Sequence, residues 1–408
     1  MSVAKIKNSA KNPLIRWLAA FLALLCSVTA GLGLWYWHYC QSPAQLTAET
    51  TVFIPRGAGV RQIGTLLATQ GVLRNDIRYL TYLRLSGLGE KLKAGEYAFA
   101  PGITPPQVLA KIARGEVVRH PVTIAEGLRL TQIAAIFAQD GWVDPAHFLA
   151  LAQDRAFIRS LGLNVEEGME INSLEGYLFP DTYLMVRDEA PASAVPTEPT
   201  EPTGKPQELQ KSQGMREEKL IRHMVQRFEE VWASLPKTGQ AGLSRHQVLT
   251  LASVVEKETG QAQERPLIAR VFLNRLELGM RLQSDPTVIY GLGDAFSGNL
   301  RRKDLRTPSS HNTYVIPGLP PGPICSPGRA ALAAVLAPAQ SNALYFVSRN
   351  DGSHVFSTTL AEHNRAVNTY QRQGKKGETT NTPALQANPA AEQHKPLPHP
   401  RNQDNTAN

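Results

Sequence analysis

Residues 244–260 read SRHQVLTLASVVEKETG, and this stretch determines how the part of the chain around it folds. Its apolar residues recur at helical spacing, Ser244 suits the position that caps a first turn, and Gly260 fits the end. The next stretch, residues 264–279, reads ERPLIARVFLNRLELG and closes again with a glycine, Gly279. The two stretches therefore predict two consecutive helices.

Two glutamates, Glu256 and Glu258, lie near the end of the first predicted helix. On a helix each has apolar neighbours four and seven residues earlier, and apolar surroundings raise the pKa of a carboxyl group. A glutamate that stays protonated near neutral pH can donate a proton to a glycosidic oxygen. The spacing does not choose between the two residues, and a pair of solvated surface carboxylates would explain the pattern as well.

Polar residues gather in three loop-rich segments after the helices, SDPTVIYGLG (284–293), TPSSHNTY (307–314) and GLPPGPICSPG (318–328). Prolines stiffen the last segment and glycines permit its turns. Stiff polar loops with aromatic residues are suited to line a sugar-binding cleft, although ordinary turns would have the same composition.

The runs ALYFVS (343–348) and HVFST (354–358) flank the turn residues Asn-Asp-Gly and predict a β-hairpin. Helices, turns and a late hairpin together predict an α+β catalytic domain over residues 215–370.

A repeat precedes this region. Residues 52–71 (VFIPRGAGVRQIGTLLATQG) and 122–141 (VTIAEGLRLTQIAAIFAQDG) align without gaps, and a looser third copy runs through 97–115. Each copy predicts a short strand, a glycine turn and an amphipathic helix. Such units must pack on one another, which fits either a compact spacer or a glycan-binding module.

The remaining segments divide the chain further. Residues 121–188 form a connecting part, in which LEGYLFPDTY (174–183) predicts a buried strand or turn that joins two domains. Residues 189–214 contain PTEPTEPTG, a composition that cannot build a core, and predict a disordered insertion. The polar residues 371–408 predict a disordered tail.

The N-terminus carries an uncharged apolar run at residues 17–37, long enough to cross a hydrocarbon core of roughly 30 Å. Basic residues precede the run, so the positive-inside rule places residues 1–16 in the cytoplasm and the rest outside. A signal peptide cleaved near Ala30 and a lipoprotein attached at Cys26 are the weaker alternatives.

Composition excludes several classes of protein. The formal net charge of +8 suits an anionic polymer, but no block rich in lysine and arginine predicts nucleic-acid binding. The three cysteines are scattered and predict neither a disulfide framework nor a metal site. A thiol nucleophile at Cys325 has no evident histidine partner in the sequence, and the histidines lack metal-ligand spacing.

Taken in order, LASVVEKETG, IARVFLNRLELGMRLQSDPTVIYGLG, NTY, GLPPGPICSPG, LYFV, HVFS and AEHN resemble the endolytic murein transglycosylase family (MltG or YceG-like). The resemblance extends from the apolar run to about Tyr370 and includes LEGYLFPDTY. Residues 41–120 are similar to the LysM-like portion of these proteins.

The resemblance implies a lyase that cleaves the β-1,4 bond between N-acetylmuramic acid and N-acetylglucosamine inside nascent strands, leaves 1,6-anhydro ends and thereby terminates strand elongation. The family's catalytic glutamate maps to Glu258. One carboxylate can suffice, because the C6 hydroxyl of the sugar is the nucleophile, and neither a metal nor a cofactor is needed. The expected supporting or substrate-binding residues are Glu256, Glu264, Gln283, Asp285, Thr287, Tyr290, Asn312 and Tyr314.

The resemblance also implies a single-pass protein of the inner membrane with its catalytic part in the periplasm. Peptidoglycan strands are the expected substrate, and penicillin-binding proteins or other wall synthases are the expected partners. His311 departs from the family pattern, since many relatives carry tyrosine there. Two alternatives stay open: a hydrolase in which Glu256 or Glu264 activates water, and a non-catalytic wall-binding protein that relies on the repeat.

Overall fold

The computed structural model describes residues 13–163, 170–187, 206–236 and 242–373. The predicted PTEPTEPTG insertion, the tail after Gln373 and most of the predicted cytoplasmic N-terminus lie outside these residues. The chain divides into two compact units. Unit 1 comprises Met1–Ala125, Thr131–Ala152 and Pro180–Arg222, and unit 2 comprises Glu126–Leu130, Gln153–Phe179 and His223–Asn408.

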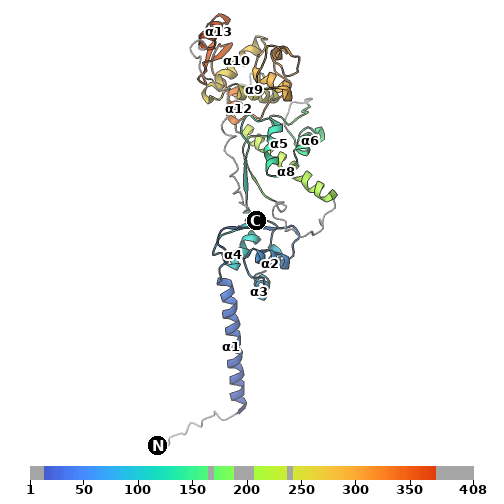
Figure 1. The fold of residues 1–408 in the computed structure, drawn as a ribbon, viewed down its shortest axis with the longest axis vertical. Coiled ribbons are helices and arrows are strands. Elements are labelled where there is room, and N and C mark those ends of the chain that lie inside the picture. Colours follow the sequence, from blue (N-terminus) through green and yellow to red (C-terminus); the bar gives the residue numbers. More distant parts are fainter. Residues whose placement is uncertain (1–12, 164–169, 188–205, 237–241, 374–408) are drawn as a thin grey trace, which may run out of the picture. The chain divides into compact units, whose positions relative to one another are not determined.

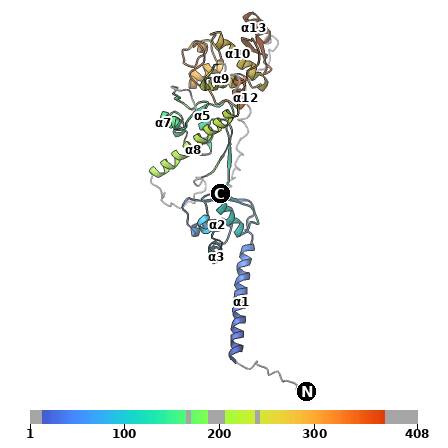
Figure 2. The same ribbon diagram turned by 180° about the vertical axis from the view of Figure 1, so that it is seen from behind.

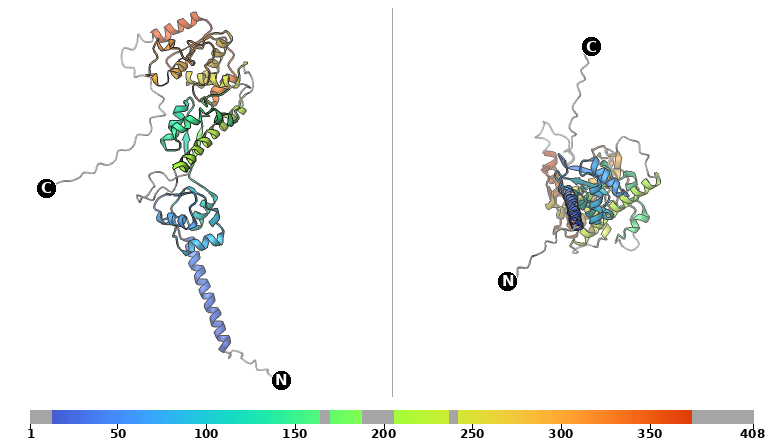
Figure 3. Two further views of the ribbon diagram at one scale, coloured as in Figure 1. Left: turned by 90° about the vertical axis from the view of Figure 1, so that its right-hand side faces the viewer. Right: turned by 90° about the horizontal axis from the view of Figure 1, so that it is seen from below.

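The N-terminal apolar run forms one unbroken helix, α1 (Pro13–Gln41), visible in every view (Figures 1, 2 and 3). Its segment Arg16–Gln41 is 26 residues long and apolar enough to cross a membrane. This length and composition fit a single-pass anchor or a signal sequence.

The predicted repeat is confirmed as three strand–turn–helix copies. They are β1 (Thr50–Ile54) with α2 (Val60–Thr69), β2 (Gly95–Phe99) with α4 (Pro105–Arg114), and β3 (His120–Thr123) with α5 (Leu130–Gln139). The turn of each copy contains a glycine in the left-handed region, with φ of 78°, 82° and 78° at Gly57, Gly102 and Gly127. Glycine adopts this backbone conformation without the steric cost of a Cβ atom, which explains why the repeat contains it.

The copy that contains β1 and the copy that contains β2 share one core. Their strands pair in an antiparallel sheet that sets Thr50 opposite Phe99. The 10-residue helix α3 (Ile77–Ser86) and the short 3₁₀ helix η1 (Gly89–Lys91) lie between them in the chain. Buried side chains of this core include Val52, Ile54, Ile63, Leu67, Tyr79, Tyr97, Phe99, Leu109 and Ile112.

The copy that starts with β3 pairs instead with β4 (Thr182–Met185). The strand β4 ends the LEGYLFPDTY segment, whose Leu174, Tyr177 and Leu178 are buried as predicted. The chain passes from unit 2 to unit 1 inside this segment, between Phe179 and Pro180.

The helices α6 (Pro145–Leu151), α7 (Arg155–Ser160) and α8 (Pro206–Ala233) complete this part of the chain. The start of α8 corrects one prediction, since residues 206–214 are helical where a disordered insertion was expected. The helix is amphipathic from Glu217 onward, and the packing of its apolar face outweighs the composition of the preceding segment.

Unit 2 is built around α9 (Arg245–Glu258), which packs against α10 (Arg265–Glu277) and α12 (Arg329–Leu336) (Figures 1 and 2). Ser244 caps α9 in a capping box with Gln247, as its sequence position predicts. Side chains from His246 to Val255 are buried on every face of the helix, so α9 is the central helix of the unit.

The predicted hairpin is confirmed as β5 (Tyr345–Ser348) paired with β6 (His354–Ser357).

Sequence reasoning was wrong about SDPTVIYGLG, which forms the helix α11 (Asp285–Leu292) rather than a loop. Pro286 lies in the first turn of that helix, where proline is tolerated. The helix α13 (Leu360–Val367) was not anticipated either, although Thr359 and Glu362 form a capping box at its start. Short elements are η3 (Ala262–Glu264), η4 (Gly293–Ala295), η5 (Asp304–Arg306) and the π-helix η6 (Asn368–Gln373). Over the residues that the structure describes, helices together with three two-stranded sheets make a mixed α and β fold.

Candidate active site

A cavity of about 420 Å³ lies within unit 2, at the C-terminal end of α9. Its size falls in the range of small-molecule binding sites, which is about 300–1,000 Å³. The end of α9, the segment before α11, the β5–β6 hairpin and α13 supply its walls. The lining residues are Glu258, Arg275, Leu282, Gln283, Asp285, Tyr314, Tyr345, Phe346, Val347, Ser348, His354, Leu360, His363, Val367 and Gln371.

Glu258 is the last residue of α9, and its carboxyl group faces this cavity. Its pKa is raised to about 7, mainly by burial and to a smaller extent by the negative charge of Asp285. A hydrogen bond from the Ser284 hydroxyl to Oε1 and the positive charge of Arg275 oppose this rise. Among the described residues Oε2 has no hydrogen-bond partner, so the carboxyl group can carry a proton toward the cavity near neutral pH.

Asp285 and Tyr314 face the cavity together. The Tyr314 hydroxyl donates a hydrogen bond to Asp285 Oδ1 at 2.7 Å. Burial, and then this bond, raise the pKa of Tyr314 above its usual value, so the tyrosine stays a donor and holds the aspartate in place. Gln283 beside them is exposed and has a φ of 51°, a strained conformation that often marks functional sites.

Two buried threonines, Thr287 and Thr313, hold the first turn of α11 against the segment that contains Tyr314. The Ser284 amide donates to Thr313 Oγ1 at 2.9 Å, and the hydroxyls of Thr287 and Thr313 are 2.8 Å apart. Thr287 therefore supports the site from behind and does not line the cavity.

Asn312 also acts from behind. Its side-chain amide donates to the carbonyl oxygens of Asp304, Leu305 and Thr307 at 3.4, 3.2 and 2.8 Å, and its Oδ1 accepts from the Tyr314 amide at 3.0 Å. These four bonds organise the loop that delivers Tyr314 to the cavity.

Arg275 is a charged group of the cavity that the sequence did not reveal. Its guanidinium group is buried and donates to the carbonyl oxygens of Leu344 (2.7 Å) and Leu282 (2.6 Å). No carboxylate lies within ion-pair distance of it among the described residues. A buried cation beside Glu258 favours the ionised form of that carboxylate, which is the form that exists after the proton has left.

The other two glutamates of the region are already paired. Glu256 Oε1 accepts from Arg265 at 2.9 Å and its Oε2 from the Gly328 amide at 3.0 Å. Glu264 accepts from the backbone amide of His354 at 2.8 Å and lies 2.6 Å from its Nδ1. Neither glutamate lines the cavity, although His354 does.

A second buried carboxyl group lies in the LEGYLFPDTY segment. Glu175 accepts from the Leu130 amide at 3.0 Å and from the Tyr290 hydroxyl at 3.3 Å. Burial raises the pKa of Glu175 to about 7. Tyr290 packs against His311, with ring centroids 4.8 Å apart, so the departure at His311 changes the surroundings of Tyr290 and not the lining of the Glu258 cavity.

The proline-rich segment, residues 318–328, packs along α9. It does not line the Glu258 cavity. The Pro321 carbonyl lies 2.9 Å from His246 Nε2, and the Ile324 amide donates to Ser253 Oγ at 3.0 Å. Cys325 is fully buried, and burial raises the pKa of its thiol well above the usual range, which argues against a thiolate nucleophile.

Of the predicted site residues, Glu258, Gln283, Asp285 and Tyr314 line one cavity, whereas Glu256, Glu264, Thr287, Tyr290 and Asn312 lie outside its lining. Sequence reasoning did not select Arg275, Tyr345 or His363 as site residues. The available signal was Arg275 itself, a charged residue among the apolar residues Val271, Phe272, Leu273 and Leu276, because a buried helix rarely contains a charge without a role.

The chain is similar in sequence to several known proteins. A family model described as the YceG-like family matches residues 52–199 and 205–369. A protein of Bacillus subtilis (strain 168) named endolytic murein transglycosylase is 31% identical over 342 residues, which are 80% of this chain and 87% of the relative. A protein of the same name from Streptococcus pneumoniae (strain D39) is 27% identical over 85% of this chain, which spans 64% of that relative. A crystal structure of a yceG-like protein from Listeria monocytogenes, 31% identical, aligns over 78% of this chain and 99% of its own with a TM-score of 0.48.

Proposed function

Since the chain belongs to the YceG-like family, we propose that it is a peptidoglycan lytic transglycosylase that cleaves MurNAc-β-1,4-GlcNAc bonds within nascent strands. One observation carries the proposal. Glu258 is the only glutamate that lines the cavity among the described residues, and its pKa is raised to about 7. A carboxyl group with that pKa is suited to donate and then accept a proton at neutral pH.

In the proposed reaction, protonated Glu258 donates to the glycosidic oxygen as the bond between that oxygen and C1 of the muramoyl sugar breaks. The carboxylate then accepts the proton of the C6 hydroxyl while O6 attacks C1, and a 1,6-anhydro ring closes. The proton returns to Glu258, and no water is consumed. Ser284 and Arg275 stabilise the carboxylate between the two steps, and the closeness of the internal hydroxyl replaces a second catalytic carboxylate.

The hydrolase alternative needs a carboxylate that activates water. Glu256 and Glu264 are poorly suited, because Arg265 and His354 occupy their oxygens. Asp285 is the candidate for activating water in this alternative, since it lines the same cavity as Glu258.

We also propose that α1 anchors the protein in the inner membrane and that both units face the periplasm. The antiparallel pair β1–β2 with α2 and α3 between its strands supports a LysM-like, glycan-binding role for the first module. Penicillin-binding proteins or other wall synthases remain the expected partners, and the site is proposed to end strand elongation.

Incubation of the full chain with uncrosslinked glycan strands tests the proposal. The length distribution of the strands should shorten, and Glu258→Gln should reduce the rate at least about 100-fold while strand binding persists. Glu277→Gln is the matched control, because Glu277 is an exposed glutamate of α10 that is absent from the cavity lining. Full activity of Glu258→Gln would disprove the assignment, and binding without cleavage by the unaltered protein would favour the wall-binding alternative.

A further inference from the structure

The last turns of α1 belong to the folded core of unit 1. Tyr39 is only 2% exposed and packs within the same hydrophobic core as the β1–β2 sheet. Its hydroxyl donates to the Arg74 carbonyl oxygen at 3.3 Å, and the Ala44 amide just after the helix donates to the Ile103 carbonyl at 2.7 Å. The end of α1 is therefore joined to the module by packing as well as by the chain.

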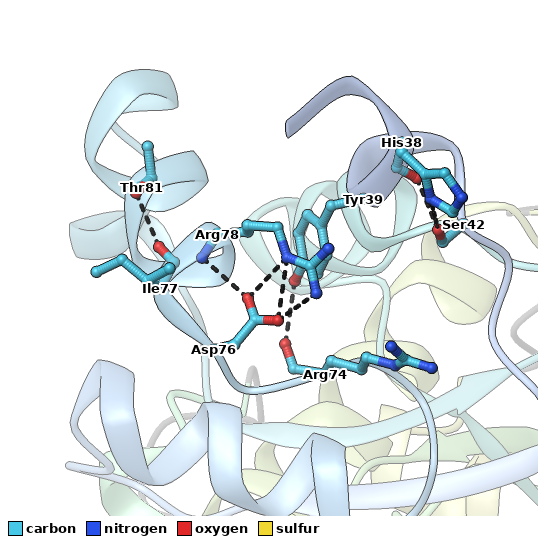
Figure 4. A network of polar contacts seen from close by, with 8 residues as sticks. All are labelled: His38, Tyr39, Ser42, Arg74, Asp76, Ile77, Arg78 and Thr81. Carbon is cyan, nitrogen blue, oxygen red and sulfur yellow. Dashed lines mark hydrogen bonds and ion pairs between the residues drawn. The ribbon is translucent and has the colours of Figure 1, made fainter. Parts of the chain in front are cut away.

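Arg78 of α3 strengthens this junction. Its guanidinium carbon lies 4.8 Å from the ring centroid of Trp35 and 4.9 Å from that of Tyr39, both on α1. Asp76, the N-cap of α3, accepts from Arg78 Nε at 3.0 Å and so holds the guanidinium group in position. Figure 4 shows Arg78 between Asp76 and Tyr39, with the Tyr39 hydroxyl directed at Arg74. The start of α3 is thus fixed beside Trp35.

The outer face of α3 has the composition of an interfacial helix. Tyr79 and Leu83 point into the core and are buried. On the opposite face Ile77 is 63% exposed and Leu85 is 73% exposed. The exposed Arg84 lies on the same face, since residues seven and eight apart are close together on a helix. Apolar side chains next to arginines are typical of helices that lie on a bilayer.

We infer that α3 rests on the lipid surface, with Ile77 and Leu85 entering the interfacial region and Arg84 contacting phospholipid phosphates. The inference rests on the proposed anchoring of the chain by α1. Trp35 is 47% exposed two turns from the end of a membrane-length helix, at the level where tryptophans mark the membrane interface. Because Arg78 holds α3 against Trp35, α3 lies at that level too. In Figures 1 and 2, α3 lies at the end of unit 1 from which α1 emerges.

The arrangement would give the first module two attachments to the membrane, the spanning helix and the resting helix. Two attachments prevent the module from rotating freely about its anchor, so its other faces keep a constant orientation toward the cell wall. A second copy of the chain or another protein could cover the same apolar pair, and the experiment below separates these occupants from lipid.

Fluorescence quenching in lipid nanodiscs tests the inference on the full chain. Cys26 and Cys40 are replaced by alanine, and buried Cys325 is kept. A bimane label is then attached at Ile77→Cys or Leu85→Cys, with Leu278→Cys as the matched control, because Leu278 is 64% exposed on unit 2. Phospholipids spin-labelled near the headgroup quench dyes in the interface, and dissolved iodide quenches dyes in water.

We expect lipid quenching at positions 77 and 85 to exceed that at position 278 at least twofold, with the reverse order for iodide. Strong iodide quenching at 77 and 85 without lipid quenching would overturn the inference, and so would protection from both quenchers, which would indicate a protein partner. A label at Leu22→Cys within α1, measured with phospholipids spin-labelled deep in the acyl chain, separates a failure of this inference from a failure of the proposed anchor. Lipid quenching there without quenching at 77 refutes only the inference, whereas its absence refutes the anchor as well.

Discussion

Replacing Glu258 by glutamine should abolish strand cleavage and also stabilise the folded protein above neutral pH. The carboxyl group has a pKa of about 7 in the folded protein against an ordinary value of 4.5. At about 1.4 kcal/mol for each tenfold change in proton affinity, ionising it in the folded state costs about 3 kcal/mol more than in the unfolded chain. Glutamine occupies the same space without a charge, so the variant avoids this cost.

The sign of the effect follows from the protons bound in each state. Below pH 4.5 both states hold the proton and Glu258 costs nothing. Between 4.5 and about 7 the unfolded chain has lost the proton while the folded protein keeps it, so stability falls as pH rises. Above about 7 the full cost applies. The glutamine variant should therefore nearly match the unaltered protein at about pH 4 and exceed it by about 3 kcal/mol at about pH 8.5.

Urea unfolding of the full chain in detergent, followed by tryptophan fluorescence, measures this difference. Trp232 on α8 reports on unit 2, which contains Glu258. Glu277→Gln serves as the control and should change stability by less than about 0.5 kcal/mol at either pH, because its side chain is 57% exposed. Equal stability of Glu258→Gln and the unaltered protein at about pH 8.5 would refute the reasoning from burial.

Two further variants test the Glu258 site, and a third tests the neighbouring ion pair of Glu256 with Arg265. Asp285→Asn removes a negative charge that helps to raise the pKa of Glu258, so the alkaline limb of a plot of kcat/KM against pH should move to lower pH. Ser284→Ala removes the hydrogen bond that lowers that pKa, so the limb should move to higher pH; an unmoved limb in both variants would mean that another group titrates. Arg265→Ala leaves the Glu256 carboxylate buried without its cation and should lower the free energy of unfolding by about 3 kcal/mol in the urea titration, and a loss below 1 kcal/mol would contradict the importance of this pair.

Local signals in the sequence were sufficient for much of the fold. The cap at Ser244, the Asn-Asp-Gly turn of the hairpin and the glycines of the repeat all act within a few residues, so the pattern alone predicted α9, the hairpin and the three strand–turn–helix copies. The helix α11 was misread because Pro286 and two glycines suggest a loop. Proline in a first turn is compatible with a helix, and packing against α9 decided the outcome.

The site itself depended on contacts that sequence spacing does not encode. The helical pattern gave Glu256 and Glu258 the same apolar surroundings. Arg265, from the next helix, pairs with Glu256, whereas Glu258 has no such partner among the described residues and faces the cavity. The pair Glu264–His354 joins residues 90 positions apart, and only the tertiary fold brings them together.

Mass spectrometry of the ends of the cleaved strands distinguishes a lytic transglycosylase from a hydrolase. We expect the full chain to produce 1,6-anhydro-muramoyl ends from uncrosslinked strands, because the internal C6 hydroxyl takes the place of water. Products heavier by one water molecule, with reducing muramoyl ends, would rule out the proposed lytic reaction. They would mean that a second carboxylate activates water in the cavity, and Asp285 would be the first to examine.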